Sequence, residues 1–172
     1  MAPALDEIDV KLLAELEADA DRSNVELAKA IGLSPAATFN RVRRLKETGL
    51  VIGITARLDS AALGFNLQVY VEVTLSRHDD VAHKRFQDAV CELPQVVLAD
   101  WVTGEVDALL WVVARNVGEL QRVLLLLSSR GGAQRVVTLL RLEQLKAPTP
   151  LPLAVDPDAP VRRRRRAGTV RS

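Results

Sequence analysis

Residues 34–46 constrain the fold of this chain most, because they combine the signals of a helix start with four cations and no acid. Ser34 can accept hydrogen bonds from the first free backbone N–H groups, and Pro35 suits the first helical position since it has no N–H. At helical spacing the segment has an apolar side for packing and a polar side. The apolar side consists of Thr38, Phe39, Val42 and Leu45. The polar side consists of Ala36, Ala37, Asn40, Arg43 and Arg44.

Two further helices precede this segment. Ser23 and Glu26 have the spacing of a capping box, and Gly32 suits the end of the helix that they begin. Asp6 is a suitable N-cap for a helix over residues 6–19, whose apolar residues recur at helical spacing. A short helix, a turn and a second capped helix, covered by a third, predict a helix-turn-helix unit.

The local charge of residues 34–46 indicates what this unit binds. The formal net charge of the chain is only +1, so the cluster matters more than the total. Small residues at the start of the helix would let the backbone approach base edges, and the cations can reach phosphates or guanine. The predicted contacts to double-stranded DNA are Ser34, Ala36, Ala37, Thr38, Asn40, Arg41, Arg43, Arg44 and Lys46. An ordinary solvated helix face is the alternative that stays open.

Composition excludes several classes of protein. The chain has 172 residues, 48% of them hydrophobic and 26% charged, which is typical of a globular protein with a substantial core. Cys91 is the single cysteine, so no disulfide can form within the chain, and a reducing cytoplasm is expected. The longest apolar run, residues 108–114, is far shorter than the ~20 residues that a membrane helix needs. We therefore expect a cytoplasmic, nucleoid-associated protein without a membrane partner.

Beyond Gly49 the hydrophobic period changes from that of a helix to that of a strand. Residues 50–58 are β-branched and predict a linking strand or wing. The remaining pattern predicts strand, helix, strand, strand, helix and strand. These elements are expected at residues 67–75, 81–93, 96–102, 106–114, 120–127 and 136–145. This order predicts an α+β fold, a winged helix-turn-helix followed by a ferredoxin-like βαββαβ domain.

An antiparallel sheet with both helices on one face leaves its other face uncovered. The leucines of residues 124–127 also exceed what one helical stripe can bury. Exposed apolar surface of this kind marks an interface, so the sequence predicts a homodimer.

Two motifs together resemble the Lrp/AsnC family of transcription regulators. The first is Gly32-Leu33-Ser34-Pro35 with Arg41-Val42-Arg43-Arg44-Leu45, followed by Gly49-Leu50-Val51. The second is residues 102–110, which resemble the family's Gly-acid-aromatic-Asp-aromatic-Leu-Leu pattern, with Val106 and Ala108 in place of the aromatic residues. The resemblance covers about residues 5–146 and implies a DNA-binding regulator that dimerises. Whether dimers assemble further into octamers stays open.

The resemblance also implies a small effector, such as a free amino acid, bound between dimers. Backbone amides of a loop can hold a carboxylate while an acid holds an ammonium group. The residues placed at this site by the resemblance are Thr103, Gly104, Glu105, Asp107, Ala108 and Thr138. The alternative is that Gly104 only permits a tight turn and Asp107 only caps it.

The resemblance and the composition together divide the chain into four predicted segments. Residues 1–49 would be the DNA-binding domain and residues 50–65 the linker strand or wing. Residues 66–146 would form the effector-binding and oligomerisation domain, and residues 147–172 a disordered tail rich in Pro and Arg. The tail arginines, Arg162 to Arg166, either add phosphate contacts or only solubilise the chain.

Two other functional classes stay open beside a regulator. A siroheme-decarboxylase-like enzyme shares the two-domain architecture, but this chain retains the cations of residues 41–46. A ligand sensor with a vestigial DNA-binding half is a third class. His78 and His83 are five residues apart, a poor helical register for joint metal ligation, so no metal and no cofactor is predicted. The expected protein is a regulator and not an enzyme.

Overall fold

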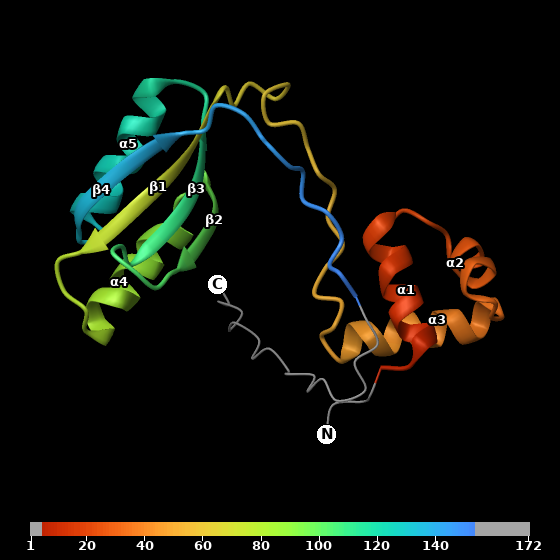
Figure 1. The fold of residues 1–172 in the computed structure, drawn as a ribbon. Coiled ribbons are helices and arrows are strands. Elements are labelled where there is room, and N and C mark those ends of the chain that lie inside the picture. The colour runs from red at the N-terminus through yellow and green to blue at the C-terminus, as the bar shows by residue number, and fades with distance from the viewer. Residues whose placement is uncertain (1–4, 154–172) are drawn as a thin grey trace. The chain divides into compact units, whose positions relative to one another are not determined.

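The structure is a computed structural model that describes residues 5–153. The chain divides into two compact units (Figure 1). The N-terminal unit contains the first three helices and continues through Ala56, and the C-terminal unit spans Arg57–Lys146. Residues 147–153 form neither helix nor strand, and the arginine run at 162–166 lies outside the described residues.

The N-terminal unit consists of helices α1 (Glu7–Ala18), α2 (Asn24–Ile31) and α3 (Pro35–Glu47). Each begins where the sequence predicts, because a capping side chain accepts a backbone N–H there: Asp6 from Asp9, Ser23 from Glu26 and Ser34 from Ala37. Gly32 ends α2 with φ +71°, a left-handed conformation that residues with a Cβ rarely adopt. The predicted helix-turn-helix unit is confirmed.

The predicted linking strand or wing at residues 50–58 is wrong. Residues 52–59 form no helix or strand, and the side chains of Ile52, Ile54 and Leu58 are exposed. β-Branched residues favour a strand only where a neighbouring strand supplies hydrogen bonds and packing, and none pairs with this segment in the described chain. Leu50 and Val51 instead pack against the helical core.

The C-terminal unit contains one four-stranded antiparallel sheet with the strand order β2-β3-β1-β4. Its elements are β1 (Leu67–Leu75), α4 (Asp80–Cys91), β2 (Val96–Trp101), β3 (Ala108–Ala114), α5 (Val117–Ser129) and β4 (Ala133–Leu140). The predicted ferredoxin-like βαββαβ arrangement is confirmed. The last strand lies earlier than expected, because its partner β1 begins at Leu67 and has no residue opposite 143–145.

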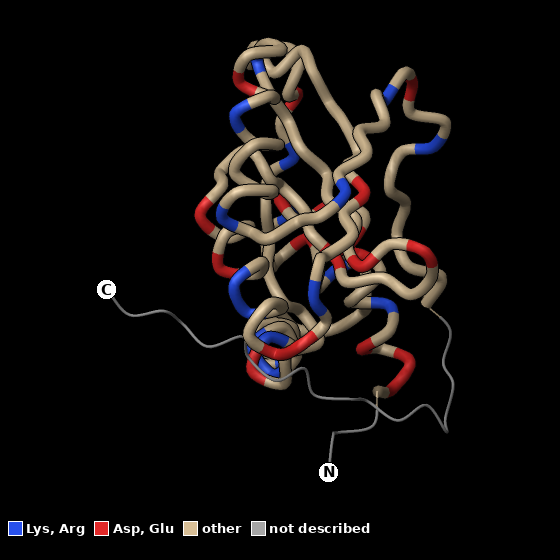
Figure 2. Tube along the Cα trace, turned by 90° about the vertical axis from the view of Figure 1, so that its left-hand side faces the viewer, with Lys and Arg blue, Asp and Glu red and all other residues tan. Residues whose placement is uncertain are grey.

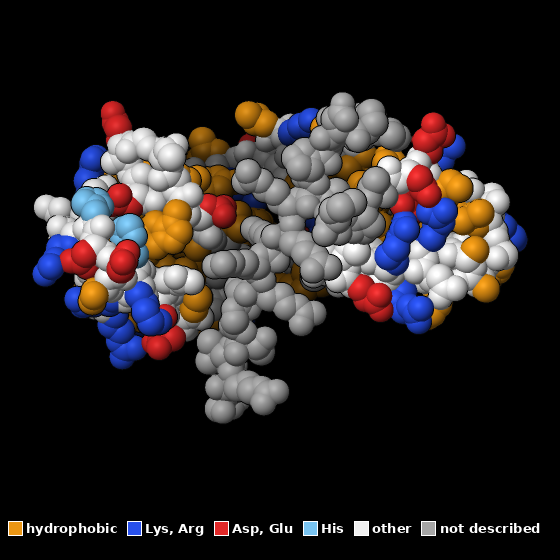
Figure 3. Space-filling model, turned by 90° about the horizontal axis from the view of Figure 1, so that it is seen from below, with side chains coloured by type: hydrophobic (Ala, Val, Ile, Leu, Met, Phe, Trp, Pro, Cys, Tyr) orange, Lys and Arg blue, Asp and Glu red, His pale blue; other side chains and the backbone are white. Residues whose placement is uncertain are grey.

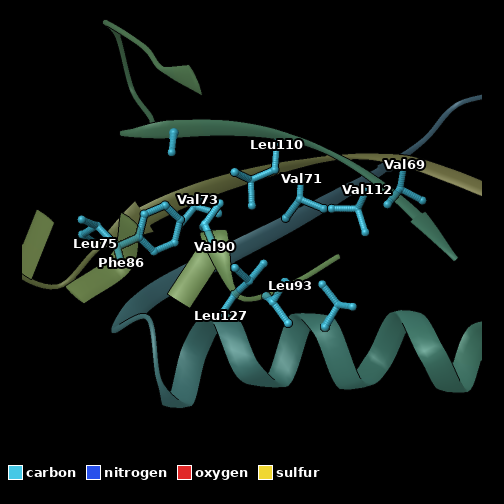
Figure 4. Close-up of a cluster of buried hydrophobic side chains, with 12 residues drawn as sticks. Val69, Val71, Val73, Leu75, Phe86, Val90, Leu93, Leu110, Val112 and Leu127 are labelled. Carbon is cyan, nitrogen blue, oxygen red and sulfur yellow. The ribbon is translucent and has the colours of Figure 1, made fainter. Parts of the chain in front are cut away.

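The core of this unit lies between the sheet and the two helices. Val69, Val71 and Val73 alternate along β1 and point toward α4 and α5, where they meet Phe86 and Leu127 (Figure 4). Alternate residues of a strand point to opposite faces, so the residues between them point to the uncovered face of the sheet.

The uncovered face, here called the open face, carries apolar side chains from all four strands. Cross-strand partners share a face, so the pairings place Tyr70 beside Trp111 and Leu139, and Leu98 beside Trp111. Tyr70, Leu98, Leu109 and Leu139 are each at least one third exposed. On the opposite layer Leu125 of α5 is 67% exposed, as the excess of leucines predicts. No described helix has the length and apolar character to span a membrane.

Replacing Leu127 tests the position of this core. Leu127→Ala should lower the free energy of unfolding by about 2–5 kcal/mol, because the side chain is fully buried between α5 and the sheet. Urea unfolding followed by tryptophan fluorescence reports on this unit, since Trp101 and Trp111 both lie in its strands. The matched change Leu125→Ala, on the exposed side of the same helix, should alter stability by less than about 0.5 kcal/mol. Equal effects of the two changes would contradict this core.

Candidate DNA interface and effector loop

The N-terminal unit holds α2 and α3 in a fixed relation. Leu12, Leu27 and Leu45, one from each helix, form its buried centre. The Asn24 side chain at the start of α2 donates to the Pro35 carbonyl at the start of α3 at 2.7 Å. The start of α3 is therefore anchored to α2, and the rest of the helix packs over the core.

One face of α3 is free of protein contacts in the described part of the chain. The exposed residues recur at spacings of three and four, so they form a single outer stripe. The outer stripe consists of Ala36, Phe39, Asn40, Arg43, Lys46 and Glu47. Arg43 approaches Glu47 at 3.8 Å, but both side chains are exposed, and such pairs are weak. This stripe therefore presents amide, aromatic and cationic groups to solvent, with the Glu47 carboxylate at its C-terminal end.

Phe39 lies on the side of α3 opposite to that expected, whereas Thr38 lies on the expected packing side and is too buried for the DNA contact that was also predicted for it. Phe39 was predicted to pack, but it is 56% exposed in the middle of the outer stripe. Thr38 was predicted to contact DNA, but it is fully buried and its hydroxyl donates to the Ser34 carbonyl at 3.0 Å. Thr38 cannot reach DNA from this position. Three- and four-residue spacing groups Phe39 with Ala36 and Arg43, a signal that the polar character of its neighbours obscured.

Arg41 and Arg44 also depart from the expected arrangement, because both bind acids of α1. Arg41 Nη1 donates to Asp9 Oδ1 and to Asp6 Oδ2, each at 2.7 Å. Arg44 Nη2 donates to Asp9 Oδ2. The Asp9 side chain is only 1% exposed. Two of the four cations predicted to contact DNA, Arg41 and Arg44, are therefore paired with a buried carboxylate.

The pKa values of Asp6 and Arg41 reflect these contacts. Burial raises the pKa of Asp6, but the hydrogen bonds from Arg41 and from the Asp9 amide and the nearby positive charges outweigh it, so the pKa lies below its ordinary value. The hydrogen bonds to Asp6 and then to Asp9 raise the pKa of Arg41. Both groups are thus held in their charged forms.

Sequence reasoning missed Asp9, although a signal was present. Asp9 lies four residues after Leu5, three before Leu12 and seven before Leu16, which places an acid within the apolar stripe of α1. A buried carboxylate needs a cationic partner. The acid-free segment at residues 34–46, with four cations, was the richest source of one.

The predicted effector residues Thr103, Gly104 and Glu105 form an exposed turn between β2 and β3. Gly104 has φ +125°, a conformation that favours glycine. Asp107 closes the turn. Its Oδ2 accepts the Leu75 N–H at 2.7 Å, and its Oδ1 lies 3.3 Å from His78 Nδ1. Asp107 therefore fastens the β2–β3 loop to the end of β1.

The other two predicted effector residues lie elsewhere. Ala108 is buried in the core under the sheet, on the wall of a cavity of about 220 Å³ between α4 and β2. Thr138 pairs with Val71 and so lies on the helix-bearing face of the edge strand β4, exposed to solvent. Within one chain, β3 and β1 separate the β2–β3 loop from Thr138, and the structure does not bring them together.

The two histidines lie beside the same loop. His83 stacks on Trp101 with ring centroids 4.9 Å apart, and His78 pairs with Asp107. Figure 3 shows the two imidazoles on the surface of the C-terminal unit, one of them next to apolar side chains. Acidic and basic positions are interspersed along this unit (Figure 2), in contrast with the acid-free run at 34–46.

Comparison with known proteins decides the family. Residues 5–46 match the AsnC-type helix-turn-helix domain, and residues 68–151 match the Lrp/AsnC ligand binding domain. The leucine-responsive regulatory protein of Rhizobium meliloti (strain 1021) is 38% identical over 143 residues, which cover 83% of this chain and 92% of that protein. The chain belongs to the Lrp/AsnC family. The leucine-responsive regulatory protein of Escherichia coli (strain K12) is 42% identical over 106 residues, covering 62% of this Lrp/AsnC chain and 65% of that protein.

Solved structures agree with this assignment to the Lrp/AsnC family. A transcriptional regulator from Neisseria meningitidis, crystallised as an L-methionine complex, has a TM-score of 0.81 and 29% identity, covering 87% of this chain and 97% of that one. An AsnC family regulator from Agrobacterium tumefaciens has a TM-score of 0.78 and 29% identity, covering 86% of this chain and 97% of that one. The protein is a DNA-binding transcriptional regulator and not an enzyme, which disfavours the siroheme-decarboxylase alternative. Its ligand binding domain implies a small-molecule effector.

Acid should weaken the contact between Asp6 of the α1 N-cap and Arg41 of α3, over the pH range in which Asp6 becomes protonated. The folded-state pKa of Asp6 is lowered, so its contribution is complete above the ordinary value of 3.8 and is lost as the pH falls through the lowered value. Asp6→Asn keeps an N-cap but removes the charge. The wild type should be more stable than this variant at about pH 6, and the difference should shrink toward about pH 3. Urea unfolding followed by circular dichroism measures this difference, and a pH-independent difference would contradict the pairing with Arg41.

Proposed function

We propose that α3 enters the major groove of double-stranded DNA and that its outer stripe makes the contacts. The observation that carries this proposal is the stripe itself, a continuous exposed face with Arg43 and Lys46 on a helix whose opposite face is buried. A helix-turn-helix presents its second helix to DNA in this manner. A DNA-bound protein of this kind would be found in the cytoplasm at the nucleoid.

The chemistry of the stripe assigns a role to each residue. Arg43 can donate two hydrogen bonds to guanine, and Asn40 can pair with adenine. Ala36 and Phe39 offer apolar contact to a thymine methyl group. Lys46 can bind phosphate, while Ser34 and the partly exposed Ala37 place the backbone amides of the helix start near the phosphate chain. Base contacts would come from Ala36 to Arg43, and phosphate contacts from the backbone amides of the helix start and from Lys46.

Arg43→Ala tests this interface. Loss of a bidentate base contact should cost about 1–3 kcal/mol of binding to a selected sequence, and loss of a phosphate contact should instead weaken binding to all sequences. Gel-shift titration of the folded variant measures both. Lys11→Ala, an exposed cation on α1, serves as control and should bind like the wild type. Unchanged affinity in Arg43→Ala would exclude this face of α3.

The open face of the sheet supports a homodimer. Exposed apolar residues, among them Tyr70, Leu109 and Leu139, lie side by side on its neighbouring strands. Two copies related by a two-fold axis would cover each other's open faces. The dimer would then present two α3 helices to two half-sites of DNA. Assembly of dimers into an octamer would use other surfaces, such as the one around Leu125.

A charge on the open face should break the dimer. Leu139→Arg places a cation among apolar side chains, so sedimentation should show a larger monomer fraction at micromolar concentration than for the wild type. Val81→Arg, on the exposed side of α4, should leave the assembly unchanged. Circular dichroism checks that both variants fold. A wild-type chain that sediments as a folded monomer would contradict the proposed dimer.

The β2–β3 loop is proposed as one side of an amino-acid effector site. The L-methionine complex of the Neisseria meningitidis regulator supports an amino acid as ligand. Thr103, Gly104 and Glu105 are exposed, whereas Asp107 is fastened to Leu75 and His78. Because Thr138 lies apart from this loop within one chain, a site that uses both must combine more than one chain.

An effector can act only if it binds two states of the protein with different affinity. Asp107→Asn keeps an acceptor for the Leu75 N–H but removes the charge that an ammonium group needs. The variant should lose the response to the effector while binding DNA normally without it. Calorimetric titration with each of the twenty amino acids, followed by gel shift, measures this. No heat with any amino acid would contradict the proposed ligand class.

A further inference from the structure

The ion cluster between α1 and α3 does more than stabilise the N-terminal unit. Asp9 occupies a place in the apolar stripe of α1, next to Leu12, which is fully buried. A well-packed apolar residue there would avoid the cost of removing a carboxylate from water. Stability alone therefore does not explain an acid at this position.

The cluster fixes the rotation of α3 about its own axis. Arg41 and Arg44 are three residues apart on adjacent turns, and each binds a different oxygen of the Asp9 carboxylate. The contacts of Leu45 are apolar and non-directional, so they tolerate a small rotation. Two directional contacts to one buried group do not.

The rotation decides which side chains reach solvent. Arg41 and Arg43 point about 160° apart at roughly 100° per residue, so anchoring Arg41 inward turns Arg43 outward. The same contacts also hold Arg44, whose Nε is buried and has no hydrogen-bond partner among the described residues. Both guanidinium groups are thereby paired with acids of α1, although 43% of the Arg44 side chain stays exposed.

We propose that Asp9 is a positioning residue for DNA recognition. It orients the outer stripe of α3 toward the bases, and it withdraws the charges of Arg41 and Arg44 from phosphate binding. The inference rests on the proposed placement of α3 in the major groove. Together these two roles would raise specificity. Fewer free cations lower the affinity for every DNA sequence, while the fixed rotation of α3 preserves the affinity for the recognised sequence.

Asp9→Asn separates these effects, because it preserves the size of the side chain and removes its charge. The probes are the tightest duplex that the full-length wild type selects from a random library, and poly(dI-dC) as non-specific DNA. The variant should bind the selected duplex at least about tenfold more weakly. Its binding to poly(dI-dC) should become more salt-dependent, with a log–log slope steeper by about one for each arginine released. A folded variant with the wild-type ratio of affinities and the wild-type slope would overturn the proposal.

A second pair of variants keeps the test decisive if Asp9→Asn does not fold. Arg44→Met leaves Asp9 paired with Arg41, and Arg43→Met removes a cation of the outer stripe. The proposal expects Arg44→Met to weaken binding to the selected duplex without changing the salt slope, because its charge is already paired. Flattening of the slope by about one in Arg44→Met would overturn it, because that result indicates a direct phosphate contact. If Arg43→Met binds both DNAs like the wild type, the placement of α3 fails instead, so the two failures are distinguishable.

Discussion

The buried carboxylate of Asp9 is the contact on which the DNA-binding half of this protein depends. It accepts hydrogen bonds from both Arg41 and Arg44, so the orientation of α3 follows from a charge on α1. Breaking a buried ion pair by removing one partner typically costs about 3–5 kcal/mol, because the other charge stays buried. The cluster therefore couples the folding of the three helices to the face that α3 presents.

The C-terminal unit is organised by a different constraint, a sheet covered on one face only. The valines of β1 pack under α4 and α5, while aromatic and leucine side chains stay on the open face. The family assignment accounts for both halves, since a helix-turn-helix is followed by a ligand binding domain. Asp107 ties the loop of that domain to β1, so a ligand at the loop would act on the sheet through an existing contact.

Much of the fold follows from local signals in the sequence. Caps at Asp6, Ser23 and Ser34 predict the helix starts, and the alternation along β1 predicts its buried face, because these features depend on neighbouring residues alone. The linker fails as a strand because pairing requires a distant partner. The inward Arg41 and Arg44 and the outward Phe39 were missed for the same reason: their direction is set by α1, which lies about thirty residues earlier.

The direct measurement of the central claim is photo-crosslinking from α3 to DNA. A benzoylphenylalanine in place of Phe39 keeps the aromatic ring, and its added benzoyl group can project into solvent from the exposed outer stripe, whereas the same residue at Ala14 lies on the exposed side of α1. We expect irradiation to link position 39 to the bases of a selected duplex and to leave position 14 unlinked. Crosslinks from position 14 with none from position 39 would contradict the account, because DNA would then meet α1 and not the outer stripe.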